Sequence, residues 1–280
     1  MRRKVALITG GSSGIGRVTA LHLLDAGWHV VVAGRSALTF SERELFERPW
    51  LQMHASMHFL PLNLADLASV KDCAQAFLSL NLPLDVLVLN AGVAGLRGQT
   101  KQGFELAFGL NHLGHFLLTQ LLVAKLRESA PSRVVTVASR AHHFAYDGIK
   151  WSKLRRASES WFGIQDYAAS KLANIWFSRV VGKKLAHDNV SSYCLHPGVV
   201  RTGIWRYAPA WSKPLLGLRS MLTPEEGAMT TLHCVLHAPQ HETSLYYANC
   251  RSTRPSAMAL NDEEADKLWL HSLEFCREWL

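Results

Sequence analysis

The sequence has little charge, few cysteines and no long uninterrupted run of apolar residues. Charged residues make up 19% of its 280 residues and apolar residues 48%, a balance that excludes an intrinsically disordered chain. No run approaches the ~18 consecutive apolar residues that a membrane-spanning helix needs. The first residues lead directly into a short apolar run, so we expect neither a transmembrane segment nor a signal peptide.

The cysteines are odd in number, widely spaced and never arranged as a CxxC pair. This pattern is typical of reduced thiols in a reducing compartment. We therefore expect a cytoplasmic protein. The five cysteines are Cys73, Cys194, Cys234, Cys250 and Cys276.

Basic residues outnumber acidic residues by 30 to 22, which gives a net charge of +8. A solvated surface that leans positive accounts for this excess. This is the favoured explanation, and the alternative is an anionic ligand, such as a phosphorylated cofactor, a nucleic acid or a membrane lipid. Composition alone does not choose among these ligands.

Short apolar runs alternate with longer amphipathic stretches along the whole chain. The runs are rich in β-branched residues and continuous, which is typical of parallel strands covered on both faces. About six repeats of strand and helix predict an α/β fold, a doubly wound parallel sheet of about seven strands with helices on both faces. The expected strands are residues 5–8, 30–33, 59–62, 86–89, 134–137 and 193–195, and the expected helices include residues 18–26, 69–80, 103–126 and 167–187.

No linker rich in Gly, Ser or Pro divides the chain, so we expect residues 1–280 to form a single domain. Two stretches interrupt the alternation of strands and helices, at about 140–165 and about 202–221. Long loops in compact domains usually carry function. We predict an insertion in the first stretch and a substrate lid in the second, with Trp205 and Trp211 as the apolar wall of the lid. The alternative is that these tryptophans pack against the core or a neighbouring subunit.

A glycine-rich turn joins the first expected strand to the first expected helix. Its sequence, Thr-Gly-Gly-Ser-Ser-Gly-Ile-Gly at residues 9–16, lets the backbone turn tightly and approach a pyrophosphate. The N-terminus of the following helix supplies free N–H groups to that anion. We therefore predict a dinucleotide cofactor, with contacts at Gly10, Ser12, Ser13, Gly14, Ile15 and Gly16.

The second expected strand ends at Gly34-Arg35-Ser36 and offers no carboxylate to the cofactor. Proteins that prefer the non-phosphorylated cofactor place a carboxylate here to bind the ribose 2′-hydroxyl. A guanidinium instead pairs well with phosphate oxygens. Arg35 and Ser36 therefore predict NADP(H), the alternative being an ordinary surface arginine at a strand end.

The spacing Gly-x-x-x-Gly-x-Gly, with further motifs in chain order, resembles the short-chain dehydrogenase/reductase family from residue 4 to about residue 248. The motifs are Asn90-Ala91-Gly92, Asn111, Ser139, Tyr167-Ala168-Ala169-Ser170-Lys171 and Pro197-Gly198. The resemblance implies a Rossmann-type fold and a nicotinamide cofactor. The further cofactor contacts that it implies are Asn63, Leu64, Asn90, Ala91, Gly92, Tyr167, Lys171, Pro197, Gly198, Val200 and Thr202. Asn63 stands where the family typically has Asp, and its carbonyl still reaches the adenine amino group.

The resemblance also implies a catalytic set of Asn111, Ser139, Tyr167 and Lys171. Tyr167 and Lys171 are four residues apart in a helical stretch, so they lie one turn apart on one face. We expect the lysine ammonium and the positively charged cofactor ring to lower the pKa of the tyrosine from ~10. In the family the lysine also holds the nicotinamide ribose, the serine binds the substrate oxygen, and the asparagine opens its helix to hold a water that links the lysine to solvent.

The implied reaction is hydride transfer between the nicotinamide and a carbonyl or alcohol. In reduction, Ser139 polarises the carbonyl and Tyr167 gives the proton. Because the phosphorylated cofactor is kept mostly reduced in cells, reduction is the expected direction. A non-catalytic NADPH-binding sensor or scaffold is the alternative, and the intact set of four residues disfavours it.

Ser139 and Tyr167 are 28 positions apart, about twice the usual family spacing. The insertion between them opens with Arg140-Ala141-His142-His143 and resembles the retinol dehydrogenase and WW-domain-containing oxidoreductase branch. Residues 111–119, 170–174, 196–202 and 245–269 resemble the same branch. A hydrophobic aldehyde, ketone or alcohol is therefore the expected substrate, in contact with Ser139, Trp205 and Trp211.

Other partners are weighed by their sequence signatures. The pair His233 and His237 lacks the carboxylate pattern of a zinc hydrolase, so we expect no metal. The basic stretch 150–156 is interpreted as a solvated insert, with contact to acidic lipid or a partner protein as the alternative. No signature supports nucleic-acid binding. We expect a homodimer or a monomer.

Overall fold

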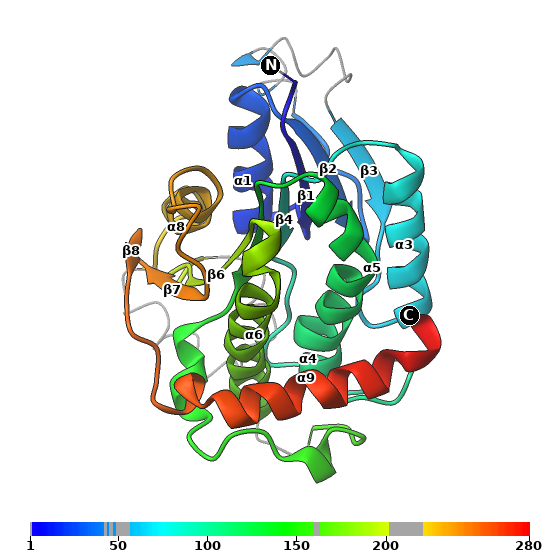
Figure 1. Cartoon of the computed structure of the whole chain (residues 1–280), viewed down its shortest axis with the longest axis vertical. Helices are drawn as coiled ribbons and strands as arrows, with labels where there is room; N and C mark the ends of the chain where they lie inside the picture. Colours follow the sequence, from blue (N-terminus) through cyan, green and yellow to red (C-terminus); the bar gives the residue numbers. More distant parts are fainter. Residues whose placement is uncertain (1, 42–43, 45–46, 49–56, 159–162, 202–220) are drawn as a thin grey trace.

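An eight-stranded sheet forms the centre of the protein (Figure 1). The structure is a computed structural model, and it describes residues 2–41, 44, 47–48, 57–158, 163–201 and 221–280. The strands are β1 (Val5–Thr9), β2 (His29–Gly34), β3 (Met57–Pro61), β4 (Val86–Leu89), β5 (Ser132–Val137), β6 (Val190–His196), β7 (Leu245–Ala248) and β8 (Arg251–Ser252). Within the described residues their order is β3-β2-β1-β4-β5-β6-β7-β8, with β8 antiparallel to β7 and all other neighbours parallel. The predicted doubly wound sheet is confirmed, and β8 adds a short antiparallel edge.

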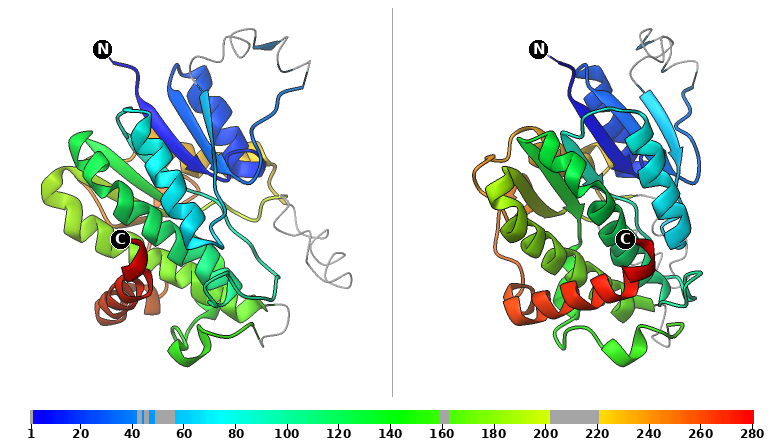
Figure 2. Two further views of the ribbon diagram at one scale, coloured as in Figure 1. Left: turned by 90° about the vertical axis from the view of Figure 1, so that its right-hand side faces the viewer. Right: turned by 45° about the vertical axis from the view of Figure 1, so that its right-hand side comes forward.

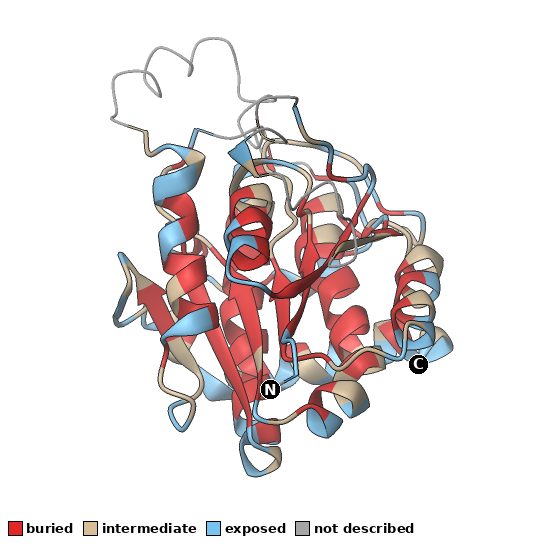
Figure 3. Cartoon of the chain, turned by 90° about the horizontal axis from the view of Figure 1, so that it is seen from above, coloured by how far each residue is buried: buried red, intermediate tan, exposed pale blue. Residues whose placement is uncertain are grey.

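Helices cover both faces of the sheet (Figure 2). Ile8 and Val32 belong to a core cluster with α1 (Gly14–Asp25) and α8 (Pro224–Leu236). Leu7 and Val31 belong to a second cluster with α3 (Leu67–Ser79), α5 (Gly114–Glu128) and α6 (Ile164–Leu185). Successive strand residues therefore face different cores, which is why the apolar runs are continuous (Figure 3).

The C-terminal helix α9 (Asp262–Cys276) lies across α6 (Figure 1). The ring of Trp269 contacts Phe116 of α5 with centroids 5.1 Å apart and stacks on Phe177 of α6 at 6.4 Å. Asn261 begins this helix by accepting a hydrogen bond from the Glu264 N–H. A capping box between Thr223 and Glu226 likewise begins α8.

One helical run is long and apolar enough to cross a membrane by length and composition alone. It comprises α4 (Leu106–Phe108), the π-helix η2 (Gly109–Leu113) and α5, and its most apolar 18-residue window has a mean hydropathy of 1.3. Inside the fold 72% of that window is buried. The run is therefore packed as a core helix.

The predicted insertion folds into short helices between β5 and α6. It contains η3 (Arg140–Phe144) and η4 (Trp151–Lys153), and Ile149 and Leu154 anchor it to the core. Residues 202–220 of the predicted lid, with Trp205 and Trp211, lie outside the described residues. Further short helices among the described residues are η6 (Ala186–Asp188), η8 (Met258–Leu260) and η9 (Arg277–Trp279).

Candidate active site and cofactor cleft

The loop between β1 and α1 is shaped by glycines that leave no room for side chains. Gly10 and Gly14 have positive φ angles of 68° and 53°. A Cβ on Gly16 would lie 2.4 Å from both the Gly10 carbonyl oxygen and Asn90 Nδ2. At the start of α1, the Ser13 side chain makes no capping hydrogen bond. The loop is thus a cradle in which the glycine backbone can approach a ligand closely at a helix N-terminus, and this fits the pyrophosphate of a dinucleotide.

Thr9, the last residue of β1, ties this loop to the end of β4. Its Oγ1 accepts hydrogen bonds from the Asn90 and Ala91 N–H groups at 2.9 and 3.1 Å. The His115 Nδ1–H faces the Asn111 carbonyl at 3.0 Å, so His115 Nε2 accepts the Thr9 hydroxyl at 2.8 Å. The Asn90 amide in turn donates to the Thr9 carbonyl at 2.9 Å. Asn90 therefore shapes the glycine loop from within the protein.

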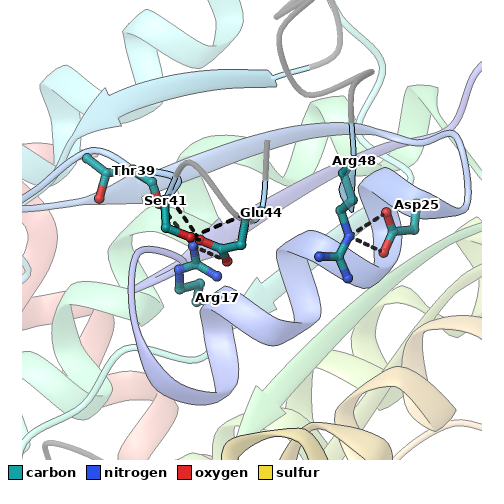
Figure 4. Close-up of polar contacts among 6 residues, drawn as sticks. All are labelled: Arg17, Asp25, Thr39, Ser41, Glu44 and Arg48. Carbon is teal, nitrogen blue, oxygen red and sulfur yellow. Dashed lines mark hydrogen bonds and ion pairs between the residues drawn. The ribbon is translucent and has the colours of Figure 1, made fainter. Parts of the chain in front are cut away.

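The end of β2 presents an exposed arginine. Arg35 and Ser36 are both exposed. The segment that follows them is held to α1 by Arg17, which pairs with Glu44 at 2.6 Å (Figure 4). Hydrogen bonds from the Ser41 backbone and side chain, and then the Arg17 guanidinium, lower the pKa of Glu44 to about 2. The Glu44 carboxylate is thus already bonded within the protein, while Arg35 stands exposed at the strand end.

The turn after β3 uses the Asn63 side chain for its own shape. Asn63 Oδ1 accepts a hydrogen bond from the Ala65 N–H at 3.2 Å. Leu64 is buried, and its carbonyl oxygen would lie 2.6 Å from a Cβ on Gly114. Both residues therefore shape the end of β3, and their predicted contact with the cofactor stays a prediction.

The helical run that follows β4 widens at Asn111, as the resemblance implies. Asn111 lies in the π-helix η2 and is fully buried. Its Oδ1 accepts from the Val93 N–H at 2.8 Å, and its amide donates to the Val93 carbonyl at 3.0 Å and to Ser170 Oγ at 2.9 Å. Single turns of π-helix occur frequently at functional sites. Here the widened turn is tied to the loop after β4 and to α6.

Tyr167 and Lys171 lie one turn apart at the start of α6, and Ser139 follows the end of β5. Lys171 Nζ is 5.7 Å from the centroid of the Tyr167 ring. A Cβ on Gly92 would lie 3.2 Å from Asn111 Oδ1 and 3.5 Å from Lys171 Nζ. Gly92 therefore allows the loop after β4 to approach both side chains. The fold brings together the four predicted catalytic residues although they are far apart in sequence.

Burial controls the pKa values in this group. Lys171 is 3% exposed, and burial lowers its pKa to about 8 while Nζ donates to the Val137 carbonyl at 2.9 Å. Burial raises the pKa of Tyr167 above its ordinary value, and a hydrogen bond with Ser139 acts in the opposite direction. In the protein alone desolvation is the larger effect, so the predicted lowering of the Tyr167 pKa by the lysine and the cofactor ring together stays a prediction.

The segment after β6 reaches the glycine loop through α8. A Cβ on Gly198, which has φ 92°, would lie 2.3 Å from Leu222 Cδ1. A Cβ on Gly227 of α8 would lie 2.5 Å from Val200 Cγ2 and 3.3 Å from Ile15 Cγ1. Val200 and Ile15 therefore both lie against Gly227 of α8. Of the other predicted contacts, Ser12 and Pro197 are half-buried, and Thr202 lies outside the described residues.

Three polar residues that shape this site were not selected from the sequence. Thr9 and His115 connect the glycine loop to η2, and Ser170 Oγ receives the Asn111 amide. The spacing of four residues between Asn111 and His115 is a usable signal, because it places both on one face of a helix. Thr9 opens the glycine-rich motif, but the sequence does not reveal its partners, which come from the loop after β4 and from α5.

The strand order reverses between β1 and β4, beside the glycine cradle and the Tyr167 group, and this arrangement defines a dinucleotide-binding α/β oxidoreductase. A family model described as short chain dehydrogenase matches residues 4–151. Human dehydrogenase/reductase SDR family member 13 is 38% identical over 275 residues, covering 96% of this chain and 72% of that protein. Human retinol dehydrogenase 12 is 38% identical over 278 residues, covering 97% and 85%. The chain belongs to the short-chain dehydrogenase family, in its retinol dehydrogenase-like branch.

Solved structures agree with this assignment. An uncharacterized protein from Mycobacterium paratuberculosis superposes with a TM-score of 0.74 at 28% identity, covering 98% of this chain and 93% of that one. The Pseudomonas aeruginosa RhlG/NADP active-site complex superposes with a TM-score of 0.66 at 26% identity, covering 87% and 93%. The likeness extends over nearly the whole fold.

Proposed function

We propose that the protein is an NADPH-dependent reductase of hydrophobic aldehydes or ketones. Its family makes it an oxidoreductase that acts on CH–OH or C=O groups. The observation that carries the proposal is the convergence of Asn111, Ser139, Tyr167 and Lys171 beside a glycine cradle that fits a dinucleotide.

The chain's own residues handle the proton in this reaction. The bound dinucleotide supplies the hydride that adds to the carbonyl carbon. Tyr167 donates its phenolic proton to the substrate oxygen, and Ser139 hydrogen-bonds the same oxygen as charge develops there. Lys171, held beside Asn111 and Gly92, returns a proton to the phenolate. The phenol of Tyr167 is protonated at neutral pH, as a proton donor requires, because its ordinary pKa is ~10 and burial raises that pKa further in the protein alone.

Replacing Tyr167 with Phe tests the chemical step. The change removes the proton donor and leaves the ring, so turnover of a panel of aldehydes and ketones should fall by ~10²–10⁴-fold. NADPH affinity, measured by quenching of protein fluorescence, should stay within about twofold, because the phenol is one contact among many. A wild-type protein that binds NADPH tightly but reduces nothing in the panel would support a sensor or scaffold instead.

The preference for NADPH is supported by the charges at the end of β2. Arg35 is exposed there, and no carboxylate stands at residues 34–36. Arg35→Asp removes the partner of the 2′-phosphate and offers a carboxylate to a 2′-hydroxyl. A charge-assisted hydrogen bond is worth ~1.5–3 kcal/mol, so the ratio of kcat/KM for NADPH over NADH should fall by about 10- to 100-fold. A wild-type protein that already prefers NADH would refute this part of the proposal.

The relatives and the insertion support the proposed substrate class. The name of the relative retinol dehydrogenase 12 gives an apolar alcohol, retinol, as the substrate of that relative. The insertion that precedes Tyr167 exposes Phe144 and Tyr146 to 66% and 70%. The predicted apolar wall of Trp205 and Trp211 adds to this reasoning from sequence. A long-chain or polyene aldehyde should therefore have a lower KM than acetaldehyde or acetone.

We place the protein in the cytoplasm because its thiols are free. Four of the five cysteines are buried and none forms a disulfide. Free thiols persist in reducing compartments. A fluorescent fusion followed by fractionation tests this location.

A further inference from the structure

Two buried histidines hold opposite ends of the peptide group that follows Ser139. His142 Nδ1 lies 2.7 Å from the Ser139 carbonyl oxygen. The Arg140 N–H donates to His196 Nδ1 at 3.2 Å. The carbonyl and the N–H belong to one planar peptide unit, so the unit cannot rotate without breaking one of these bonds. His142 comes from the insertion, and His196 is the last residue of β6.

The hydrogen-bond partners assign the proton on each ring. The Ser256 N–H donates to His142 Nε2 at 3.1 Å, so Nε2 carries no proton and Nδ1–H donates to the Ser139 carbonyl. His196 accepts with Nδ1 and therefore carries its proton on Nε2. Burial lowers the pKa of both histidines to about 4. Both rings are thus neutral at pH 7, which is the state that both bonds require.

The hydroxyl of Ser139 depends on this peptide unit for its position. Its Oγ accepts a hydrogen bond from the Ala141 N–H at 3.2 Å and also bonds the Tyr167 side chain. The ψ angle of Ser139, 152°, is the torsion between its Cα and the held peptide. A rotation of that peptide changes the angle at which Oγ meets Tyr167. An error of about 1 Å in a reacting geometry can cost ~100-fold in rate.

We propose that His142 and His196 are positioning residues that hold Ser139 against Tyr167. The C-terminal segment completes the arrangement, because Ser256 orients the His142 ring. The proposal rests on the proposed reductase function, in which Ser139 touches the substrate oxygen. The two histidines act through Ser139 and its peptide group.

Three substitutions of His142 separate positioning from packing. In His142→Asn the amide Nδ2–H can replace Nδ1–H and still donate to the Ser139 carbonyl. In His142→Gln the longer side chain places an acceptor near Nε2, which preserves the bond from Ser256 and loses the donor to Ser139. His142→Phe keeps the ring volume and loses both bonds. The matched control is His143→Asn, because His143 is exposed with its ring centroid 4.2 Å from that of His142.

The proposal fixes the order of kcat among these variants. We expect the kcat of His143→Asn to equal that of the wild type within twofold, and the kcat of His142→Asn to fall by less than about tenfold. The kcat of His142→Gln and of His142→Phe should fall by about 10- to 100-fold. The Kd for NADPH should stay within twofold in all of them. His196→Asn, which keeps an acceptor at the Nδ1 position, should retain more activity than His196→Phe. The proposal is overturned if the kcat of each Phe variant equals or exceeds that of the Asn variant and the order of kcat follows the order of thermal stability. That result would assign these histidines to packing.

A measurement without turnover separates this proposal from the proposed function. In ¹⁵N-histidine NMR spectra of the whole protein at pH 6.5, His142 should appear as the neutral Nδ1–H tautomer and His196 as the neutral Nε2–H tautomer. If the wild type reduces no carbonyl but shows these tautomers, the proposed reductase function fails, while the proposed positioning of the Ser139 peptide group by the two histidines holds. If either ring is charged at pH 6.5, or carries its proton on the other ring nitrogen, the proposed positioning is refuted.

Discussion

Replacing Lys171 with Met should change how the stability of the protein depends on pH. Lys171 is buried, and its pKa is about 8 in the folded protein against an ordinary value of 10.5. Between these two values the unfolded chain binds more protons than the folded protein, so this group makes stability rise as pH rises. Integrating from about pH 6.5 to pH 9.5 gives a gain of about 2 kcal/mol from Lys171 alone. The variant lacks this gain.

Urea unfolding of both proteins at several pH values between 6.5 and 9.5 measures the effect. The difference in unfolding free energy, wild type minus Lys171→Met, should rise by about 2 kcal/mol across that range. Lys184→Met, at an exposed position on the same helix, controls for the loss of one positive charge. A difference that stays flat across the range would show that Lys171 titrates as it does in the unfolded chain. That result would refute the desolvation argument.

Two further substitutions test the cradle and its support. Gly16→Ala places a Cβ 2.4 Å from the Gly10 carbonyl oxygen, and the resulting displacement of the loop should weaken NADPH binding by about 10- to 100-fold in a fluorescence titration. The control is Gly27→Ala, which has open space around its Cβ and should leave NADPH binding unchanged. Thr9→Val keeps the side-chain shape but leaves the Asn90 and Ala91 N–H groups without their acceptor. The free energy of unfolding, measured in urea, should therefore fall by ~2–4 kcal/mol. A fall of less than about 0.5 kcal/mol would show that the two N–H groups find other partners.

Much of the fold and of the candidate site follows from local sequence patterns. The continuous apolar runs predict buried parallel strands, and the carboxyl ends of parallel strands meet along one edge of the sheet. Residues directly after strands, such as Ser139 after β5 and Asn90 after β4, therefore converge without any knowledge of tertiary contacts. The helix starts at Thr223 and Asn261 were also predictable, because capping depends on residues only three positions apart.

The supporting contacts depend on elements that are far apart in sequence. His142 is held by Ser256, which is 114 residues away, and Trp269 packs on Phe116 and Phe177 of two other helices. No spacing in the chain encodes such contacts. The π-helix at Asn111 shows a similar limit, since helical periodicity describes the run without showing where it widens. The rise of the Tyr167 pKa in the protein alone was also not predictable, because the sequence reveals the neighbouring ammonium but not the desolvation of the phenol.

The raised pKa of Tyr167 predicts how the two directions of the proposed reaction depend on pH. The protein alone keeps the phenol protonated, because burial opposes the phenolate and the Lys171 pKa of about 8 leaves part of the lysine neutral in mildly basic solution. A reduced nicotinamide ring would be uncharged and would leave this balance in place, so Tyr167 would stay a proton donor for reduction. An oxidised ring would be positive and would lower the pKa of a phenol beside it, which would move Tyr167 towards the base that oxidation requires. On the proposed function, the optimum for alcohol oxidation should therefore lie at higher pH than the optimum for carbonyl reduction.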